Sequence, residues 1–259
     1  MSQKKAANPS KAEERLRQQY SEIAQLAGGL AHEVKNPLST IRLNMDLLAE
    51  DMEDLPESPQ QKRALKKIAV VRRETVRLED LLNEFLHFTR AHHLELTPAD
   101  INKEIRSILH FFKPQADESG VELIDFLTPD LPTVRLDKRS FRQAILNLLL
   151  NSLQAMKGQG GQIMIRSRAL GESVALDLID TGCGMEPETL EKIFDPFFST
   201  KQGGSGLGLP TVRKIIAGHG GHIAIQSEVG RGTQFTLTFP GLAQIPEFPP
   251  PPVVILPKS

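Results

Sequence analysis

The sequence is poor in cysteine and in aromatic residues: it has one cysteine, one tyrosine and no tryptophan in 259 residues, and aromatics make up 5%. The single cysteine, Cys183, excludes an intramolecular disulfide and fits a reducing compartment. The formal net charge of -1 gives no overall basic excess, so nucleic acid is not expected as a partner. Hydrophobic content of 39% and charged content of 24% are ordinary for a soluble globular protein.

Long apolar runs are also missing. The nearest candidate, Ala144–Leu153, is interrupted by Asn147 and Asn151 and falls short of the ~20 residues that span a bilayer. Residues 1–19 lack the apolar core of a signal peptide. We therefore predict a cytoplasmic protein with no membrane span, and its length allows two domains of roughly 100–200 residues.

The first third of the chain has a helical pattern with a short break at Leu55–Pro59. Apolar or small residues recur three, four or seven positions apart before and after this break, at Leu38, Ile41, Met45, Leu48, Met52, Leu65, Ile68, Thr75, Leu78, Leu82, Phe85 and Thr89. Such heptad-like spacing predicts an antiparallel helical hairpin with one apolar seam on each helix. Because two helices alone bury little surface, we predict a homodimer in which two hairpins form a four-helix bundle. A lone hairpin docked on the rest of the same chain is the alternative.

Strands and helices are mixed between about Thr97 and Leu242. Alternation and β-branched content predict strands over Val121–Leu127, Gln162–Arg168, Val174–Asp180, His222–Ser227 and Thr233–Phe239. Helices are predicted between them, over Ile101–Asp117, Lys138–Met156, Pro187–Phe194 and Leu209–Gly218. Because most strands follow one another closely, the predicted class is α+β, with a mixed or antiparallel sheet and helices on one face.

These patterns divide the chain into five segments. We expect a polar, helical extension over 1–20, the hairpin over 21–92, a linker over 93–98, the mixed domain over 99–242 and a proline-rich tail over 243–259. The tail is too rich in proline to pack regularly, and an extended polyproline stretch or a disordered end is expected. A ligand for a proline-reading module is the alternative.

His32 stands in an unusual helical segment, followed by Glu33, Asn36 and Pro37. Pro37 removes a backbone donor and should bend the helix just after the histidine. An imidazole is a competent nucleophile for phosphoryl transfer when an acceptor such as Glu33 holds one of its nitrogens. Asn36, one turn on, shares the face of His32 and can orient a water molecule for hydrolysis. A merely structural or solvated histidine is the alternative.

Asn147 and Asn151 lie on one face of the helix predicted over Lys138–Met156. Asparagine is disfavoured inside helices, so the pair indicates a polar site. An amide oxygen there can ligate Mg²⁺, a hard cation that takes few protein ligands and keeps its waters. Two solvated asparagines are the alternative.

Asp180 ends the strand predicted over Val174–Asp180 and is followed by Gly182 and Gly184. A carboxylate at a strand end can accept a hydrogen bond from the exocyclic amine of adenine, and glycines let the backbone approach a ligand. An ordinary turn has the same pattern. Thr233 begins the last predicted strand and can join the base pocket, although a plain hairpin turn also explains it.

The segment Phe194–Lys201 holds three of the few aromatic residues. It predicts the hinge of a mobile lid in which Lys201 can reach a phosphate, with packing into the core as the alternative. A glycine-rich stretch then runs into the next predicted helix, through Gly204, Gly206, Leu207 and Gly208. Free amides and the helix dipole can hold an anion there, although the stretch is neither a Rossmann fingerprint nor a P-loop.

In this order, the motifs resemble those of two-component sensor histidine kinases. The similar segments are the phosphoacceptor box His32–Leu38, the N box Asn147–Ala155, the G1 box Asp180–Gly184, the F box Phe194–Lys201 in the form of nitrogen-regulatory-type kinases, the G2 box Gly204–Leu209 and the G3 turn Gly230–Thr233. The resemblance covers nearly everything from Leu26 to Leu242.

The resemblance implies a dimerisation and histidine-phosphotransfer hairpin, followed by a Bergerat-type α/β sandwich that binds ATP. It implies that Asn151 ligates Mg²⁺, that Asn147 lies beside the phosphates and that Asp180 reads adenine. The segment between Gly182 and Gly208 would be the ATP lid. The implied activity is autophosphorylation of His32, transfer to an aspartate of a response-regulator receiver domain, and phosphatase activity toward that partner.

Two rival functions share part of this pattern. Another ATPase of the same superfamily, of the chaperone, topoisomerase or mismatch-repair kind, would have no use for His32 and Asn36 on a preceding helix. A degenerate, non-enzymatic scaffold would be expected to lack His32, Asn151 or Asp180, and all three are present. Residues before the hairpin resemble no sensor domain, so a separate sensory partner is expected to supply the signal.

Overall fold

The computed structural model of the chain describes residues 34–89, 94–201 and 204–242. It separates into two compact units, Met1–His93 with Asp195–Thr211, and Leu94–Phe194 with Val212–Ser259, and each is described by itself. Within the described ranges, no helix combines the length and the apolar character needed to cross a membrane.

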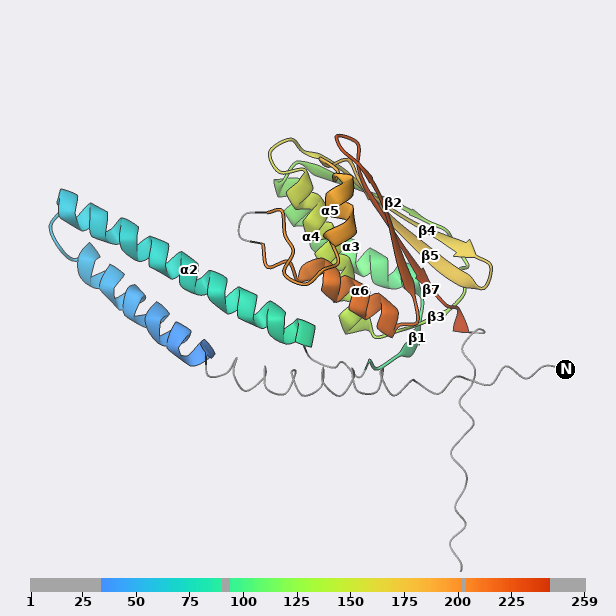
Figure 1. Ribbon diagram of the computed structural model, residues 1–259, viewed down its shortest axis with the longest axis horizontal. Helices are drawn as coiled ribbons and strands as arrows, with labels where there is room; N and C mark the ends of the chain where they lie inside the picture. Colours follow the sequence, from blue (N-terminus) through green and yellow to red (C-terminus); the bar gives the residue numbers. More distant parts are fainter. Residues whose placement is uncertain (1–33, 90–93, 202–203, 243–259) are drawn as a thin grey trace, which may run out of the picture. The chain divides into compact units, whose positions relative to one another are not determined.

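The first unit is built on a helical hairpin, formed by residues 34–53 and by α2 (Pro59–Thr89) (Figure 1). At its turn, Oγ of Ser58 accepts the amide of Gln61 at 3.1 Å, and Oε1 of Gln61 accepts the amide of Ser58 at 3.3 Å. This reciprocal pair is a capping box, with Pro59 at the first helical position. Nε2 of Gln61 also donates to the carbonyls of Met52 (2.6 Å) and Leu55 (3.0 Å), so one side chain joins the two helices. The predicted hairpin is confirmed.

The predicted apolar seam is divided between two surfaces of this hairpin. Leu38, Ile68 and Thr75 are buried, whereas other seam residues remain largely exposed, namely Ile41 (42%), Leu48 (39%) and Leu78 (50%). Ion pairs join the two helices, between Arg42 and Glu79 (3.0 Å) and between Arg72 and Asp46 (2.7 Å). The hairpin therefore buries one stripe of apolar residues and leaves a second one exposed.

The second unit contains a five-stranded sheet with the order β2-β4-β5-β7-β6 (Figure 1). Its strands are β2 (Val121–Leu127), β4 (Gly161–Leu170), β5 (Ser173–Asp180), β6 (His222–Glu228) and β7 (Gly232–Phe239). β2 pairs parallel with β4, and the other three pairings are antiparallel. The predicted mixed sheet is confirmed, and the five predicted strands lie within these bounds.

Helices cover one face of the sheet: α3 (Ile101–Glu118), α4 (Lys138–Ala155) and α6 (Gly208–Gly218) from Val212 on, while the short α5 (Pro187–Lys192) follows β5. α3 and α4 each begin directly after an aspartate that caps them. Oδ1 of Asp100 accepts the amide of Asn102 at 2.8 Å, and Oδ1 of Asp137 accepts the amide of Ser140 at 2.8 Å. Both boundaries agree with the predicted first helical residues, Ile101 and Lys138.

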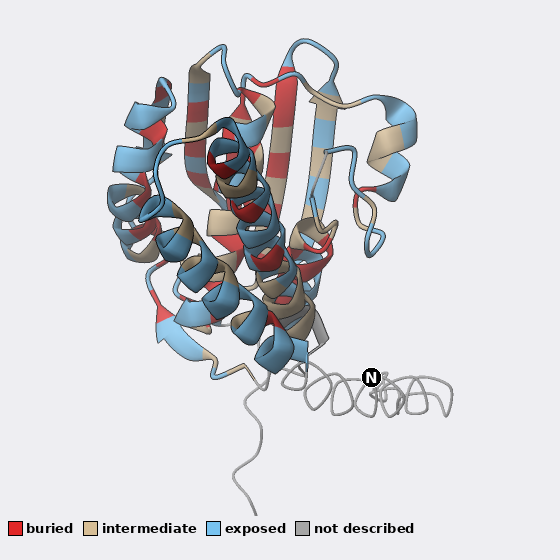
Figure 2. Ribbon diagram, turned by 90° about the vertical axis from the view of Figure 1, so that its left-hand side faces the viewer, coloured by how far each residue is buried: buried red, intermediate tan, exposed pale blue. Residues whose placement is uncertain are grey.

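The core lies between this helical layer and the sheet. Figure 2 shows the buried positions as stripes along the helices and as alternating bands along the strands, as expected for periods of 3.6 and 2 residues. Its fully buried members include Ile105, Ile108, Phe112, Ile145, Leu148, Leu149, Ile163, Ile165, Leu176, Leu178, Leu237 and Phe239.

The sequence patterns missed a second, small sheet. β1 (Thr97–Ala99) pairs antiparallel with β3 (Val134–Leu136). Each strand has three residues, too few to display an alternation, and the partners lie far apart in the chain. The predicted helix over Pro187–Phe194 is also shorter than expected, since α5 ends at Lys192.

Candidate nucleotide and phosphoacceptor site

Asp180 is the last residue of β5, and its buried carboxylate accepts hydrogen bonds from three different parts of the second unit. Oδ2 accepts the hydroxyl of Ser152 on α4 at 2.8 Å. Oδ1 accepts the amides of Gly182 at 3.0 Å and Thr233 at 3.2 Å. The helix, the loop after β5 and the start of β7 therefore converge on one carboxylate.

Glycines make this convergence sterically feasible. A Cβ on Gly232 would lie 1.9 Å from the carbonyl oxygen of Asp180, and one on Gly184 would lie 2.0 Å from that of Glu228. A Cβ on Gly182 would lie 2.7 Å from Cβ of Ala155. Backbone atoms occupy the Cβ positions at Gly232 and Gly184, and the side chains of Ala155 and Asp180 crowd the one at Gly182, so glycine is required at the first two and favoured at the third. The three glycines therefore allow the close packing around Asp180.

The loop after β5 is fastened to the end of α4. The amide of Cys183 donates to the carbonyl of Ala155 at 3.2 Å, and the hydroxyl of Thr181 accepts the amide of Gln162 at 3.0 Å. These bonds hold the loop between α4 and β4, next to the capped carboxylate.

Asn147 and Asn151 lie four residues apart on α4, so they share a helix face with Ala155, the residue that touches the Gly182 loop. Both asparagines are half-buried, whereas Leu148 and Leu149 between them are fully buried. The helix thus turns Leu148 and Leu149 into the core and presents an amide-bearing face that ends at the glycine loop.

Thr233 is buried beside a second hydroxyl. Its Oγ1 lies 2.9 Å from Oγ of Ser227, on the neighbouring strand, while its amide donates to Asp180. Ser152 and Ser227 were not among the predicted site residues. The available signal for Ser152 was its position directly after Asn151, where a polar residue falls on the buried side of a leucine-rich helix.

The segment Asp195–Thr211 belongs to the first unit and is described within it. The amide of Phe197 donates to the carbonyl of Gly206 at 3.1 Å, and a Cβ on Gly206 would lie 2.4 Å from the backbone carbon of Phe197. The predicted F-box and G2-box segments therefore meet backbone to backbone. Lys201 is exposed, and its amide donates to Oγ of Ser199 at 3.2 Å.

α6 begins within this segment at Gly208. Leu207 is buried, and its carbonyl accepts the amide (3.0 Å) and the hydroxyl (2.7 Å) of Thr211. Gly204 is exposed, whereas Gly206 and Gly208 are half-buried. Phe194 belongs to the second unit, where the guanidinium of Arg213 lies 5.4 Å from its ring centroid.

His32 and Glu33 lie outside the described residues. Asn36 is described: it is exposed on the first helix of the hairpin, and its carbonyl accepts the hydroxyl of Thr40 at 3.1 Å. The described ranges contain no group of three or more His, Cys, Asp and Glu side chains arranged to hold a metal ion.

Two protein families match consecutive parts of the chain. Residues 22–94 match the family described as His Kinase A (phospho-acceptor) domain. Residues 136–242 match the family described as histidine kinase-, DNA gyrase B- and HSP90-like ATPase. The two matches cover the hairpin and most of the mixed domain.

The proteins similar to this chain in sequence include several kinases. The chain is 34% identical over 218 residues to the sensor histidine kinase ZraS of Escherichia coli K12, covering 84% of this chain and 45% of ZraS. It is 32% identical over 219 residues to the kinase AtoS of the same organism, covering 84% of this chain and 35% of AtoS. For sporulation kinase E of Bacillus subtilis the identity is 32% over 231 residues, covering 88% and 30%. The chain thus spans less than half the length of these relatives.

Solved structures agree on the fold. ShkA, crystallised full-length with AMPPNP, superimposes with a TM-score of 0.66 at 28% identity, covering 84% of this chain and 46% of ShkA. The histidine kinase ThkA, in complex with the response regulator TrrA, has a TM-score of 0.63 at 24% identity, covering 91% and 68%. With both family matches, the ordered motifs and this fold, the chain belongs to the two-component sensor histidine kinases.

Proposed function

We propose that the chain is an ATP-dependent protein histidine kinase that phosphorylates its own His32 and passes the phosphoryl group to an aspartate of a response regulator. The observation that carries the proposal is the convergence of Ser152, Gly182 and Thr233 on the buried carboxylate of Asp180. That arrangement suits a base pocket. The match of residues 22–94 to a phospho-acceptor domain supports His32 as the proposed nucleophile.

The second unit would bind the adenine and the phosphates of ATP with different groups. Asp180 would accept the exocyclic amine, with Gly182, Gly184 and Thr233 forming the pocket around it. Asn151 would ligate Mg²⁺ and Asn147 would lie beside the phosphates, because both amides stand on the α4 face that ends at the glycine loop. Mg²⁺ usually takes one or two protein ligands and completes its shell with phosphate and water, so an amide is a fitting donor.

The lid is proposed to run from Gly182 to Gly208 and to contact the nucleotide through Phe194, Lys201, Gly204, Gly206, Leu207 and Gly208. Lys201 would offer its ammonium to a phosphate. The backbone bond between Phe197 and Gly206 would close the loop between these residues and hold the glycine stretch in place, so that its amides reach the ligand as one group.

In the proposed reaction, an imidazole nitrogen of His32 attacks the γ-phosphorus. An N–P bond forms while the P–O bond to the β-phosphate breaks, and ADP leaves. Glu33 would accept the N–H of the other ring nitrogen and stabilise the positive charge that develops on the ring. Asn36 would orient water for hydrolysis of the phosphorylated partner.

The proposed domains are the extension 1–20, the hairpin 21–92, the linker 93–98, the catalytic domain 99–242 and the tail 243–259.

The dimer is proposed from the exposed stripe of the hairpin. Four exposed apolar residues recur at intervals of seven, Val34, Ile41 and Leu48 on the first helix and Leu55 in the turn after it, and are called the heptad surface below. A seven-residue repeat of this kind packs against another helix in a bundle.

The proposed partner is a receiver domain that supplies the acceptor aspartate. ThkA, whose likeness to this chain shows the fold, was crystallised with the response regulator TrrA. The relatives ZraS and AtoS are sensor or signal-transduction kinases by name, which favours the same kind of relay here.

The test of the proposal is labelling with γ-³²P-ATP and Mg²⁺. We expect alkali-stable, acid-labile label on the wild type and none on His32→Gln. His110→Gln is the matched control, because His110 is an exposed helical histidine of α3 and should leave labelling unchanged. Equal labelling of His32→Gln and the wild type would show that the nucleophile is another residue.

Two further variants separate the roles proposed for Asp180 and Asn36. Asp180→Asn should lose ATP binding while remaining dimeric, because only the base pocket is altered. Asn36→Ala should impair dephosphorylation of the partner more than autophosphorylation. Tight ATP binding by Asp180→Asn would overturn the adenine-pocket assignment.

A further inference from the structure

We infer that Ser152 is a positioning residue that sets the preference of the base pocket for adenine over purines with a carbonyl at the same position. The inference rests on the proposed role of Asp180 in reading the base. Ser152 would act through Asp180, since its hydroxyl donates to the carboxylate.

The contact between the two residues is short and shielded from water. Oγ of Ser152 lies 2.8 Å from Oδ2 of Asp180, and the two residues are 1% and 3% exposed. An ionised carboxylate can only accept, so the hydroxyl is the donor. A buried hydrogen bond to a charged acceptor is among the stronger ones in proteins, because water cannot replace it.

The two oxygens of the carboxylate have different partners. Oδ1 accepts two backbone amides, from Gly182 and Thr233, and these fix one side of the group. The terminal torsion of a free aspartate is broad, and because the carboxylate is planar, the two amides on Oδ1 and the hydroxyl of Ser152 on Oδ2 fix this torsion together. A carboxylate oxygen can accept more than one hydrogen bond, so Oδ2 is able to bind an amino group in addition to the hydroxyl of Ser152.

This arrangement has a consequence for base recognition. Adenine carries an amino group at position 6, whereas hypoxanthine and guanine carry a carbonyl there. A carboxylate held as an acceptor binds the amino group and repels the carbonyl oxygen. Without Ser152 the carboxylate keeps only the two amide bonds to Oδ1, so Oδ2 is held less firmly as an acceptor, and the discrimination should weaken.

The same helix orders both halves of the proposed nucleotide site. Ser152 follows Asn151 directly on α4, and its hydroxyl donates to Asp180 at the end of β5. The helix itself is held in place by the buried Leu148, Leu149 and Leu153. The position of the base reader and that of the phosphate-side amides are therefore set by one rigid element.

The experiment compares equilibrium binding of Mg²⁺-ATP and Mg²⁺-ITP (inosine triphosphate) to the full chain. For Ser152→Ala we expect ATP affinity to fall about tenfold and ITP affinity to change less than about threefold. The ATP-to-ITP ratio, defined as the dissociation constant for ITP divided by that for ATP, should therefore drop. Ser152→Cys retains the shape but offers a weak S–H donor, and should give an intermediate ratio. It also provides the reading if Ser152→Ala folds poorly.

Ser167→Ala is the matched control. Ser167 is a fully buried serine of the same unit, and its hydroxyl donates to Oδ1 of Asn102 at 2.7 Å, away from the base pocket. This variant should lower the melting temperature without changing the ATP-to-ITP ratio. If Ser152 were merely structural, Ser152→Ala would likewise lower the melting temperature and leave the ATP-to-ITP ratio unchanged.

The outcomes separate this inference from the proposed function. A wild type that binds ATP and ITP equally would overturn the role of Asp180 and, with it, the inference. If the wild type prefers ATP but Ser152→Ala has the same ATP-to-ITP ratio as the wild type, the role of Ser152 alone is overturned. A lowered ratio in Ser152→Ala, with an unchanged ratio in Ser167→Ala, is the result that supports it.

Discussion

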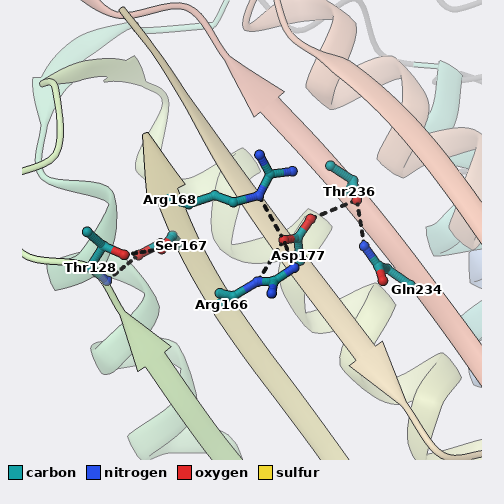
Figure 3. Close-up of polar contacts among 7 residues, drawn as sticks. All are labelled: Thr128, Arg166, Ser167, Arg168, Asp177, Gln234 and Thr236. Carbon is teal, nitrogen blue, oxygen red and sulfur yellow. Dashed lines mark hydrogen bonds and ion pairs between the residues drawn. The ribbon is translucent and has the colours of Figure 1, made fainter. Parts of the chain in front are cut away.

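The carboxylate of Asp177 lies 2.8 Å from Nη2 and 3.1 Å from Nε of Arg166, on the next strand of the sheet (Figure 3). Asp177 is fully buried, whereas the side chain of Arg166 is 47% exposed. Nε of Arg168 (3.2 Å) and the hydroxyl of Thr236 (2.8 Å) also donate to this carboxylate. Burial alone would raise the pKa of Asp177, but the bonds from Thr236, Arg166 and Arg168 outweigh it and lower the pKa below 3.8.

Asp177→Asn should therefore destabilise the second unit. The lost charge weakens the bonds from both arginines, and the expected cost of about 1–3 kcal/mol lowers the melting temperature by about 2–4 °C per kcal/mol. Thermal denaturation of the full chain would measure it. Asp125→Asn, at an exposed aspartate of β2, is the control and should melt like the wild type.

The destabilisation caused by Asp177→Asn should become smaller as the pH falls. A carboxyl whose pKa is lowered by folding stabilises the folded state above its unfolded pKa and loses this effect as pH falls through the folded pKa. The difference in free energy of unfolding between the variant and the wild type should be constant from pH 7 to about pH 5. It should shrink as the pH falls below the ordinary pKa of an aspartate, near 3.8. A difference that grows toward acid pH would contradict the assignment.

Gly232 and Gly230 form a matched pair for the close approach at Asp180. Both have a positive φ, of +110° and +77°, so alanine is strained at either position. Only at Gly232 would a Cβ meet backbone, 1.9 Å from the carbonyl oxygen of Asp180, while nothing lies within 4 Å at Gly230. We expect Gly232→Ala to abolish ATP binding and Gly230→Ala to cost only about 1 kcal/mol of stability. Equal ATP affinities of the two variants would argue against the steric reason.

Gln61 is predicted to hold the hairpin turn together. Gln61→Ala removes the capping box with Ser58 and the bonds to the carbonyls of Met52 and Leu55, at a cost of about 1–2 kcal/mol. Circular dichroism during thermal unfolding would report a lower transition of the hairpin. Gln60→Ala is the control, since the neighbouring Gln60 is exposed.

The heptad surface should mediate the proposed dimer. Leu48→Asp places a charge in the middle of this surface and should convert the dimer to a monomer, because an unpaired charge in an apolar interface costs several kcal/mol, roughly 3–5. Light scattering coupled to size exclusion would measure the mass. Leu170→Asp changes a similarly exposed leucine of the sheet and should remain dimeric; a dimeric Leu48→Asp would place the interface elsewhere.

His219 is predicted to join α6 to the start of α4. Its Nε2 accepts the amide of Asp137 at 3.0 Å, and its Nδ1 lies 2.8 Å from the carbonyl of Ile215, so the proton is assigned to Nδ1. His219→Ala leaves a buried amide without its acceptor and should cost about 1–3 kcal/mol, seen as a lower melting temperature. The exposed His222 offers the control variant His222→Ala, which should melt like the wild type.

Elements with a clear period could be predicted from the sequence. β2 has the predicted bounds, and α3 and α4 begin at the predicted residues because a capping aspartate precedes each. The small sheet of β1 and β3 could not be predicted, because three-residue strands have no period and their pairing is set by tertiary packing. The division of the hairpin seam into a buried and an exposed stripe also depended on how the two helices face each other.

The sequence by itself determined the order of the motifs and the identity of the proposed nucleophile, since both depend on residue types at fixed local spacing. The mixed sheet followed from the same local signals. Only the tertiary structure decided which buried polar groups meet. Ser152 and Asp180 lie 28 positions apart, and their hydrogen bond depends on the packing of α4 against β5, which no local pattern encodes.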